Sequence, residues 1–152
     1  EEKVMRGQAE RLGIPLLVQE TEGEKETELE DLEEALERAR EEYGIEGIVS
    51  GALRSMYQKE RVEKAAEDTG LKAFSPLWNK DQKDYMRWLV GEGFEVKITE
   101  VSAGGLDGSW EGTVLDRENL QELLELAEEH GFEPAGEGGG FETVVLDGPT
   151  FN

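Results

Sequence analysis

The sequence predicts an α/β protein, with a parallel-sheet lobe in residues 1–78 and a smaller α+β lobe in residues 79–152. Two observations lead to this fold class. In the first half, short apolar runs alternate with helical patterns, which is the order of parallel α/β units. Near Trp78–Asp81 the pattern changes to a short helix, a long alternating strand, an amphipathic helix and a closing strand.

The first elements alternate helix and strand. A helix over residues 3–12 is stopped by Gly13 and Pro15, and Ile14–Val18 follows as a strand. After a polar, acidic linker at Thr21–Thr27, a helix is expected from about Glu28 to Tyr43. Its apolar residues recur at spacings of three and four, which places them on one face: Leu29, Leu32, Leu36, Ala39 and Tyr43.

The same alternation continues to residue 75. Ile45–Ala52 is predicted to be a buried strand, and Ser55 is a suitable N-cap for a helix that reaches about Thr69. Leu71–Ser75 is predicted as the next strand, closed by Pro76.

The second lobe begins with a helix from about Gln82 to Val90, with Tyr85, Met86 and Leu89 turned inward. Phe94–Val101 alternates apolar and polar residues, which predicts a strand with one face in water. A helix over Arg117–His130 and a strand over Phe141–Leu146 complete the chain. The apolar face of that helix is formed by Leu120, Leu123, Leu124 and Ala127.

The composition is acidic and globular. The 152 residues include 37 Asp and Glu against 16 Lys and Arg, which gives a formal charge of −21 at pH 7. Such a surface repels phosphate backbones and anionic lipids, which argues against nucleic-acid or membrane partners. The acidity is explained either by solvated helix faces, among them the run Glu22–Glu34, or by adaptation to high salt.

The absence of cysteine rules out disulfides, thiolate zinc sites and thiol catalysis, and it fits a reducing compartment. No apolar run approaches the ~20 residues of a membrane span. We therefore expect a cytoplasmic protein, and no metal site of its own is predicted. The start at Glu1 suggests a processed product or a fragment.

Residues 136–143 form the most informative segment. Four of these eight residues are glycines, and Glu137 and Glu142 are set among them directly before a β-branched strand. Glycine lets a backbone approach a ligand closely, so the segment predicts a binding loop. A flexible hairpin turn is the alternative interpretation.

This segment resembles the signature of the diphthine–ammonia ligase family, a branch of the N-type ATP pyrophosphatases. Three further blocks are similar to the family in the same order and at the same spacing, so that the resemblance covers nearly the whole chain. The blocks are Gly51–Glu63, Ser75–Trp78 with Asp81, and Val101–Asp107 with Trp110.

The resemblance implies an incomplete Rossmann-like sheet of the HUP type, found in adenine nucleotide alpha-hydrolase-like proteins. The family's N-terminal ATP loop, of the form Ser-Gly-Gly-Lys-Asp-Ser, has no counterpart here. The N-terminal part of the family that is missing here also supplies two strands. Without them, the remaining strands would lack their middle neighbours. We therefore expect altered strand pairing, a homodimer, or a complementary N-terminal segment. Gly140 is a second departure, because the family normally carries a further glutamate there.

The family reaction implies the substrates and partners. A carboxylate of diphthine, a modified histidine on elongation factor 2, is activated by ATP with Mg²⁺ and then attacked by ammonia. Diphthine also bears a trimethylammonium group, which proteins hold with aromatic faces and carboxylates. The residues expected to contact this substrate are Trp78, Glu137, Gly138, Gly139, Phe141, Glu142 and Thr143.

Nucleotide contacts are expected around the second block. Gly51 and Ser55 lie just past a predicted strand end, where open α/β sheets bind ligands. Ser55, Gln58 and Arg61 share one face of the following helix, and Arg61 is expected to contact a phosphate or acyl-phosphate oxygen. A structural role for the same residues, as an N-cap, a surface amide and an arginine paired with Glu60 or Glu63, is the alternative.

The remaining chemistry is less defined by the sequence. His130, the single histidine, lies in the last turn of a helix and is expected to be structural. No catalytic base is identified. The alternatives to a ligase are a non-catalytic binding module derived from an ATP pyrophosphatase, and a related enzyme that acts on another substrate.

Overall fold

The computed structural model describes residues 1–24 and 27–152 in full, together with the backbone of residues 25 and 26. The chain packs as two compact units. The parallel-sheet unit is Pro15–Trp78, and the antiparallel-sheet unit consists of Glu1–Ile14 together with Asn79–Asn152. The assignment of these units to separate domains stays a prediction. Residues 1–14 pack with the antiparallel-sheet unit.

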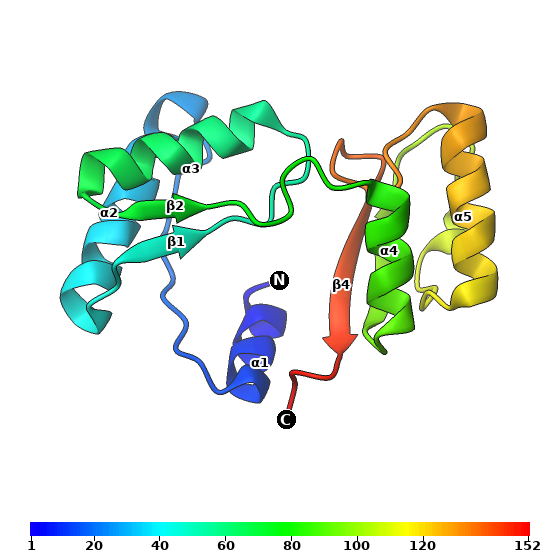
Figure 1. Cartoon of the computed structure of the whole chain (residues 1–152), viewed down its shortest axis with the longest axis horizontal. Coiled ribbons are helices and arrows are strands. Elements are labelled where there is room, and N and C mark those ends of the chain that lie inside the picture. The colour runs from blue at the N-terminus through cyan, green and yellow to red at the C-terminus, as the bar shows by residue number, and fades with distance from the viewer. The chain divides into compact units, whose positions relative to one another are not determined.

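The parallel-sheet unit contains α2 (Lys25–Tyr43), β1 (Gly47–Val49), α3 (Met56–Thr69) and β2 (Lys72–Phe74) (Figure 1). β1 and β2 pair in parallel, with Ile48 opposite Ala73. Both helices end at glycines in the left-handed region, Gly44 at φ 65° and Gly70 at φ 73°. The core lies between the helices and one face of the sheet and is built from Leu36, Ala65, Ala66 and Leu71, with Leu29, Leu32, Ile45, Ile48 and Ala73 packed against it.

Several predictions for this unit were wrong in extent. Ile14–Val18 is not a strand, and the predicted Ile45–Ala52 strand is paired only over Gly47–Val49. The second helix begins at Lys25 instead of Glu28, and Tyr43 is exposed. The sheet has two strands, and its apolar packing lies on one face, so the opposite face is open. The predicted burial of the Ile45–Ala52 strand therefore fails at Val49, which is 74% exposed.

The antiparallel-sheet unit is built on β3 (Glu95–Val101) and β4 (Phe141–Asp147), which pair antiparallel. Its helices are α1 (Glu2–Leu12), α4 (Gln82–Gly91) and α5 (Arg117–His130), with a short 3₁₀ turn η1 (Gly108–Trp110). The bounds of α5 are those predicted, and Asp116 caps it by accepting the N–H of Asn119 at 2.8 Å.

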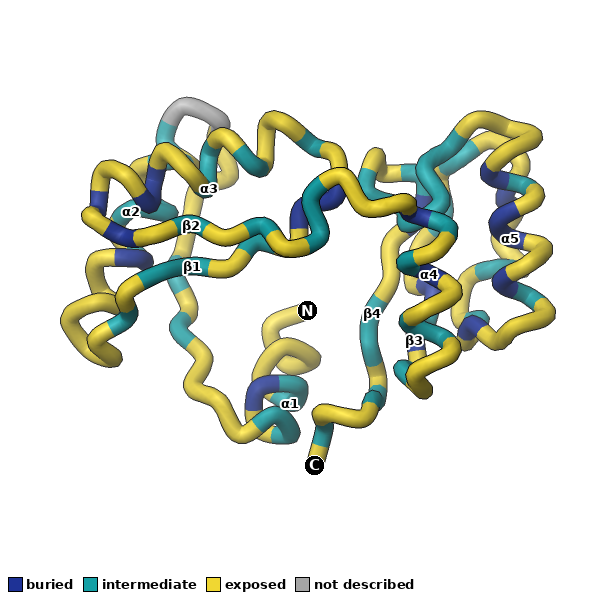
Figure 2. The backbone as a smooth tube through the Cα atoms, in the orientation of Figure 1, coloured by how far each residue is buried: buried dark blue, intermediate teal, exposed yellow. Residues whose placement is uncertain are grey.

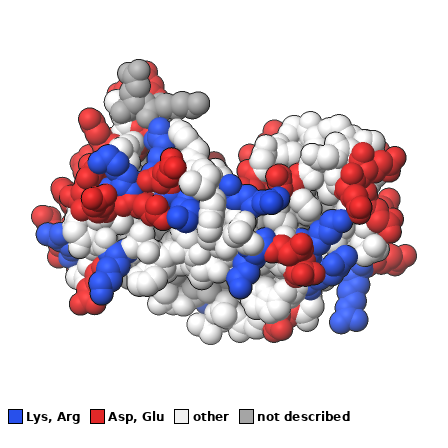
Figure 3. All heavy atoms as spheres, turned by 45° about the horizontal axis from the view of Figure 1, so that its top comes forward, with Lys and Arg blue, Asp and Glu red and all other residues white. Residues whose placement is uncertain are grey.

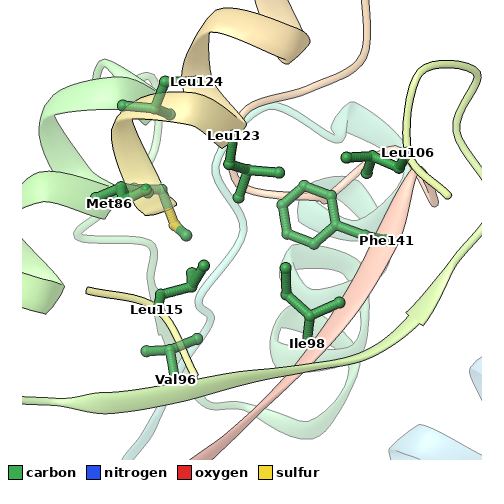
Figure 4. Packing of buried hydrophobic residues seen from close by; sticks show 9 residues of the cluster. Met86, Val96, Ile98, Leu106, Leu115, Leu123, Leu124 and Phe141 are labelled. Carbon is green, nitrogen blue, oxygen red and sulfur yellow. The ribbon is translucent and has the colours of Figure 1, made fainter. Parts of the chain in front are cut away.

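The core of this unit forms where α4 and α5 cover the sheet. Figure 4 shows Ile98 and Phe141 from the two strands converging with Leu123 from α5. Buried positions recur along one side of α5 in Figure 2, as its spacing predicts. β3 follows its predicted alternation, because Val96 and Ile98 are buried whereas Glu95 and Thr99 are exposed.

Arg11 of α1 joins the two ends of the chain within this unit. Its guanidinium donates to the carbonyl of Leu146 at 2.7 Å, to that of Asn152 at 3.1 Å and to the carboxylate of Asp147 at 2.6 Å. The ring of Phe151 lies 5.0 Å from the guanidinium carbon. We call this set of contacts the Arg11 clamp; it holds α1 against the end of β4 and the C-terminal tail.

The Arg11 clamp should weaken in acid. The backbone N–H of Gly148 and the Arg11 guanidinium both hold the pKa of Asp147 below its ordinary value of 3.8. When the pKa of a carboxyl group is lower in the folded protein than in the unfolded chain, ionisation of that group stabilises the fold at any pH above the unfolded-state pKa. This stabilisation is lost as the pH falls through the folded-state pKa. We therefore expect Asp147→Asn to unfold at lower urea concentration than the parent at pH 6, and the gap to close below pH 3.8. Urea titrations at pH 6, 4 and 3 measure this, and a gap that is constant with pH would contradict it. Arg11→Ala should keep part of its gap in acid, because it also removes the hydrogen bonds to the carbonyls of Leu146 and Asn152.

The surface carries interleaved acidic and basic side chains on the face shown in Figure 3. Salt bridges such as Lys64–Asp68 at 3.0 Å and Lys83–Glu128 at 2.9 Å are partly exposed, so each adds little stability. Among the described residues, none of the helices combines the length and the apolar character needed to cross a membrane.

Candidate functional site

A pocket of about 510 Å³ lies in the parallel-sheet unit between α2, α3 and the segment after β1. Three of the four residues predicted to contact a nucleotide, Ser55, Gln58 and Arg61, line it together. Gly51 is exposed and lies outside this lining. Among the described side chains, the lining is formed by Gln19, Thr21, Glu28, Asp31, Leu32, Ala35, Ser50, Ser55, Tyr57, Gln58, Arg61 and Val62.

Local hydrogen bonding explains why these side chains meet. The hydroxyl of Ser55 accepts the N–H of Gln58 at 3.3 Å, which fixes the start of α3 as predicted. Residues three apart on a helix share a face, so Gln58 and Arg61 follow Ser55 along the pocket wall.

Arg61 joins α3 to α2 within the pocket lining. Its guanidinium donates to Glu28 of α2 at 3.3 Å and stacks 4.3 Å from the ring of Tyr57. This pairing differs from the sequence-based alternative, which gave Glu60 or Glu63 as the partner. Sequence analysis missed Glu28 and Asp31 as pocket residues, because the run Glu22–Glu34 was interpreted as solvated surface.

A second hollow, of about 380 Å³, lies beside the glycine-rich segment of the antiparallel-sheet unit. Gly138 and Gly139, from the segment predicted to be a binding loop, line it. Glu137 is half-buried and precedes Gly138 in sequence but is not itself a lining residue, and Glu142 and Thr143 are exposed on β4 outside the lining. The other lining residues are Ser102, Ala103, Gly104, His130, Gly131, Phe132, Glu133 and Gly140.

Phe141 lies in the core instead of the hollow. Its side chain is 2% exposed and packs edge-on against Phe132, with ring centroids 6.1 Å apart. Its ring is therefore unavailable to a ligand in this structure. Phe132, which the sequence analysis did not single out, is the aromatic residue of the lining.

Gln82 fixes the segment that leads into the glycine-rich loop. Its amide is 5% exposed, donates to the carboxylate of Glu133 at 2.5 Å and accepts the N–H of Ala135 at 3.0 Å. Both hydrogen bonds join α4 to the loop, so a buried side chain far away in sequence positions it. No sequence pattern indicated this role, because a glutamine near a helix start is ordinarily exposed.

The far wall of the hollow is held by backbone contacts. The carbonyl of Gly140 accepts the N–H groups of Ser102 and Ala103 at 3.0 and 2.9 Å. The hydroxyl of Ser102 donates to the carbonyl of Gly139 at 2.5 Å. Gly105 has φ +96°, and a Cβ there would lie 2.2 Å from Cδ2 of His130, so the imidazole packs directly on this backbone. His130 thus has the predicted place in the last turn of α5 and also lines the hollow.

Trp78 belongs to the parallel-sheet unit and is half-buried there. The ammonium of Lys59 lies 5.3 Å from its ring centroid, so the ring already accepts a cation. Two aspartates from the blocks that resemble the family serve as caps: Asp81 accepts the N–H of Asp84 at 2.9 Å, and Asp107 accepts that of Ser109 at 2.9 Å.

The chain matches two family models and several curated sequences. The model described as diphthamide synthase N-terminal domain matches residues 2–73, and that described as diphthamide synthase C-terminal domain matches residues 81–152. The diphthine–ammonia ligase of Homo sapiens is 38% identical over 125 residues, which are 82% of this chain and 46% of the relative.

More distant relatives carry the same name. The diphthine–ammonia ligase of Danio rerio is 34% identical over 155 residues, covering 94% of this chain and 60% of the relative. That of Saccharomyces cerevisiae is 33% identical over 145 residues, covering 84% and 21%. The chain spans about half the length of the mammalian relatives that it matches. Since both domain models match in order and the curated relatives agree, the chain belongs to the diphthamide synthase family.

Proposed function

We propose that this chain takes part in the ATP-dependent amidation of diphthine on elongation factor 2, where it supplies nucleotide- and substrate-recognition surfaces. The observation that carries the proposal is the consecutive match to both diphthamide synthase domain models. The two hollows support it, because the residues expected to contact nucleotide gather in one and the glycine-rich loop lines the other.

The proposed reaction has two steps. A carboxylate oxygen of diphthine attacks the α-phosphorus of ATP, so that an acyl-adenylate forms and pyrophosphate leaves. Ammonia then attacks the carbonyl carbon, the bond to AMP breaks and a proton is released, which leaves the amide. Among the described residues no three metal-ligating side chains converge, so any Mg²⁺ would be held chiefly through the phosphates of ATP.

The hollow beside the glycine-rich loop is the proposed place for the trimethylammonium group of diphthine. A quaternary ammonium donates no hydrogen bonds and is held by aromatic faces and carboxylates. Glu133 and Phe132 line this hollow, and Glu137 lies in the same loop. Because the ring of Phe141 is buried in the core, Phe132 replaces it in the proposal.

Glu137→Gln tests this assignment. The substitution keeps the shape of the side chain and removes its charge, so affinity for diphthine-bearing elongation factor 2 should fall about fivefold, the equivalent of ~1 kcal/mol. Biolayer interferometry at fixed salt measures it, with the unmodified factor as the reference for binding that does not depend on diphthine. Glu122→Gln on the exposed surface of α5 is the matched control and should leave affinity unchanged. Equal affinities for Glu137→Gln and the parent would remove the assignment.

A binding module without turnover is the second candidate, and Gly140 favours it. A Cβ at this position would lie 3.2 Å from Cβ of Ala103 and 3.3 Å from Cβ of Phe132, so the loop is packed around a glycine where the family carries a glutamate. Release of pyrophosphate and AMP that requires both ammonium and the diphthine-bearing factor would identify a ligase. Specific binding of that factor without release would identify a binding module.

A further inference from the structure

The pocket of the parallel-sheet unit is a poor place for phosphates. The ionisable side chains of its described lining are Glu28, Asp31, Arg61 and Tyr57, which at neutral pH contribute two negative charges and one positive. The described part of the lining therefore has a net charge of −1, in a chain whose formal charge is −21. A polyphosphate placed here would meet repulsion at short and at long range.

Arg61, the cation expected to contact phosphate, is already engaged. Glu28 accepts its hydrogen bond at 3.3 Å, Tyr57 stacks on it at 4.3 Å, and the side chain is 22% exposed. Withdrawing Arg61 towards a phosphate would leave the carboxylate of Glu28 facing the new anion. Arg61 and Glu28 are therefore better interpreted as a structural ion pair of the pocket lining than as ligand-binding groups.

The rest of the pocket suits an uncharged ligand. Leu32, Ala35 and Val62 give it an apolar floor, and its volume of about 510 Å³ lies in the range of small-molecule sites. Asp31 is a half-buried residue of the lining, and within the described residues its carboxylate makes no hydrogen bond or ion pair. A carboxylate in that position can accept hydrogen bonds from ligand hydroxyl groups, as acidic residues do from ribose in other nucleotide sites.

We propose that this pocket recognises the uncharged base and ribose of a nucleotide, and that Asp31 accepts hydrogen bonds from the ribose hydroxyls. The inference rests on the proposed nucleotide role of this pocket and states which part of the nucleotide the pocket holds. In this arrangement the phosphates project away from Glu28 and Asp31, and the pocket adds nothing to their binding.

Affinities for adenosine, AMP and ATP test the inference. We expect adenosine to bind most tightly and ATP at least tenfold more weakly, in ¹⁵N-resolved NMR titrations of the whole chain at 0.15 M salt without Mg²⁺. The analogue 2′,3′-dideoxyadenosine should bind severalfold more weakly than adenosine. Asp31→Asn should weaken adenosine binding, because one acceptor oxygen for the ribose hydroxyls is lost. The same substitution should strengthen ATP binding, because a negative charge that repels the phosphates is removed.

A matched control separates local from global charge. Glu30→Gln removes one negative charge from the same helix outside the lining, and it should change adenosine and ATP affinities by less than twofold. ATP binding in the pocket more tightly than adenosine would overturn the inference and leave the nucleotide role standing. If none of the three ligands shifts the pocket resonances of the folded chain at millimolar concentration, the nucleotide role itself fails, and the inference with it.

Discussion

Replacing Gly136 by alanine is expected to destabilise the antiparallel-sheet unit by about 3 kcal/mol. Gly136 has φ +77°, a conformation in which an L-residue is strained by roughly 1–2 kcal/mol. A Cβ there would also lie 2.7 Å from the carbonyl oxygen of Phe141 and 3.0 Å from its ring. Because Phe141 is buried in the core, neither the backbone nor the ring can move away cheaply.

Gly139→Ala is the matched control for this prediction. Gly139 has φ +86°, but a Cβ there would meet open space, so only the conformational cost of ~1–2 kcal/mol applies. Urea denaturation of both variants at pH 7 compares the two losses. Equal losses would show that packing against Phe141 does not constrain the loop, and that its shape is set by backbone conformation alone.

The second large effect is expected at Gln82. Gln82→Leu nearly conserves volume but removes the acceptor for the N–H of Ala135 and the donor to Glu133. An unsatisfied buried polar group costs about 1–3 kcal/mol, so with both partners orphaned a loss of roughly 2–3 kcal/mol is expected. The free energy of unfolding measures this loss, and amide hydrogen exchange over residues 133–140 reports whether the loop itself loosens.

Gln121→Leu is the matched control for Gln82→Leu. Gln121 makes one side-chain hydrogen bond, to Glu125 on the exposed face of α5, and its loss should change stability by no more than ~0.5 kcal/mol. Normal exchange over the loop in Gln82→Leu, alongside a stability loss, would mean that Gln82 supports the core without positioning the loop.

The second half of the fold was predictable because its signals are local. The three- and four-residue spacing of leucines, ended by Gly131 and begun by a capping residue, gives the bounds of α5. Alternation over Glu95–Thr99 gives β3 and its buried face. Each pattern is a periodicity within a single helix or strand, and the sequence contains all the information needed to recognise it.

The errors in the first half come from a different kind of information. An apolar run such as Ile14–Val18 forms a strand only where a neighbouring strand offers hydrogen bonds, and none pairs with it here. The same reason shortens β1 and leaves Val49 exposed. The existence of a partner strand is a property of the assembled sheet, which local pattern does not contain.

The candidate site divides in the same way. The spacing of Ser55, Gln58 and Arg61 correctly predicted a shared helix face, and the structure brings all three to one pocket. Glu28 and Asp31 were missed because charge patterning cannot tell which acidic residues face another helix. The burial of Phe141 was missed because a glycine-rich loop and the core strand after it are continuous in sequence.

The Arg11 clamp has a consequence for the order in which the chain can fold. It links Arg11 to the carbonyl of Asn152, so this contact cannot form until synthesis has passed residue 152. The parallel-sheet unit, Pro15–Trp78, contains only contacts among its own 64 residues in sequence and can condense much earlier during synthesis. Until Leu146 and Asp147 have been synthesised, Arg11 lacks these clamp partners, although every residue of the parallel-sheet unit has already been made.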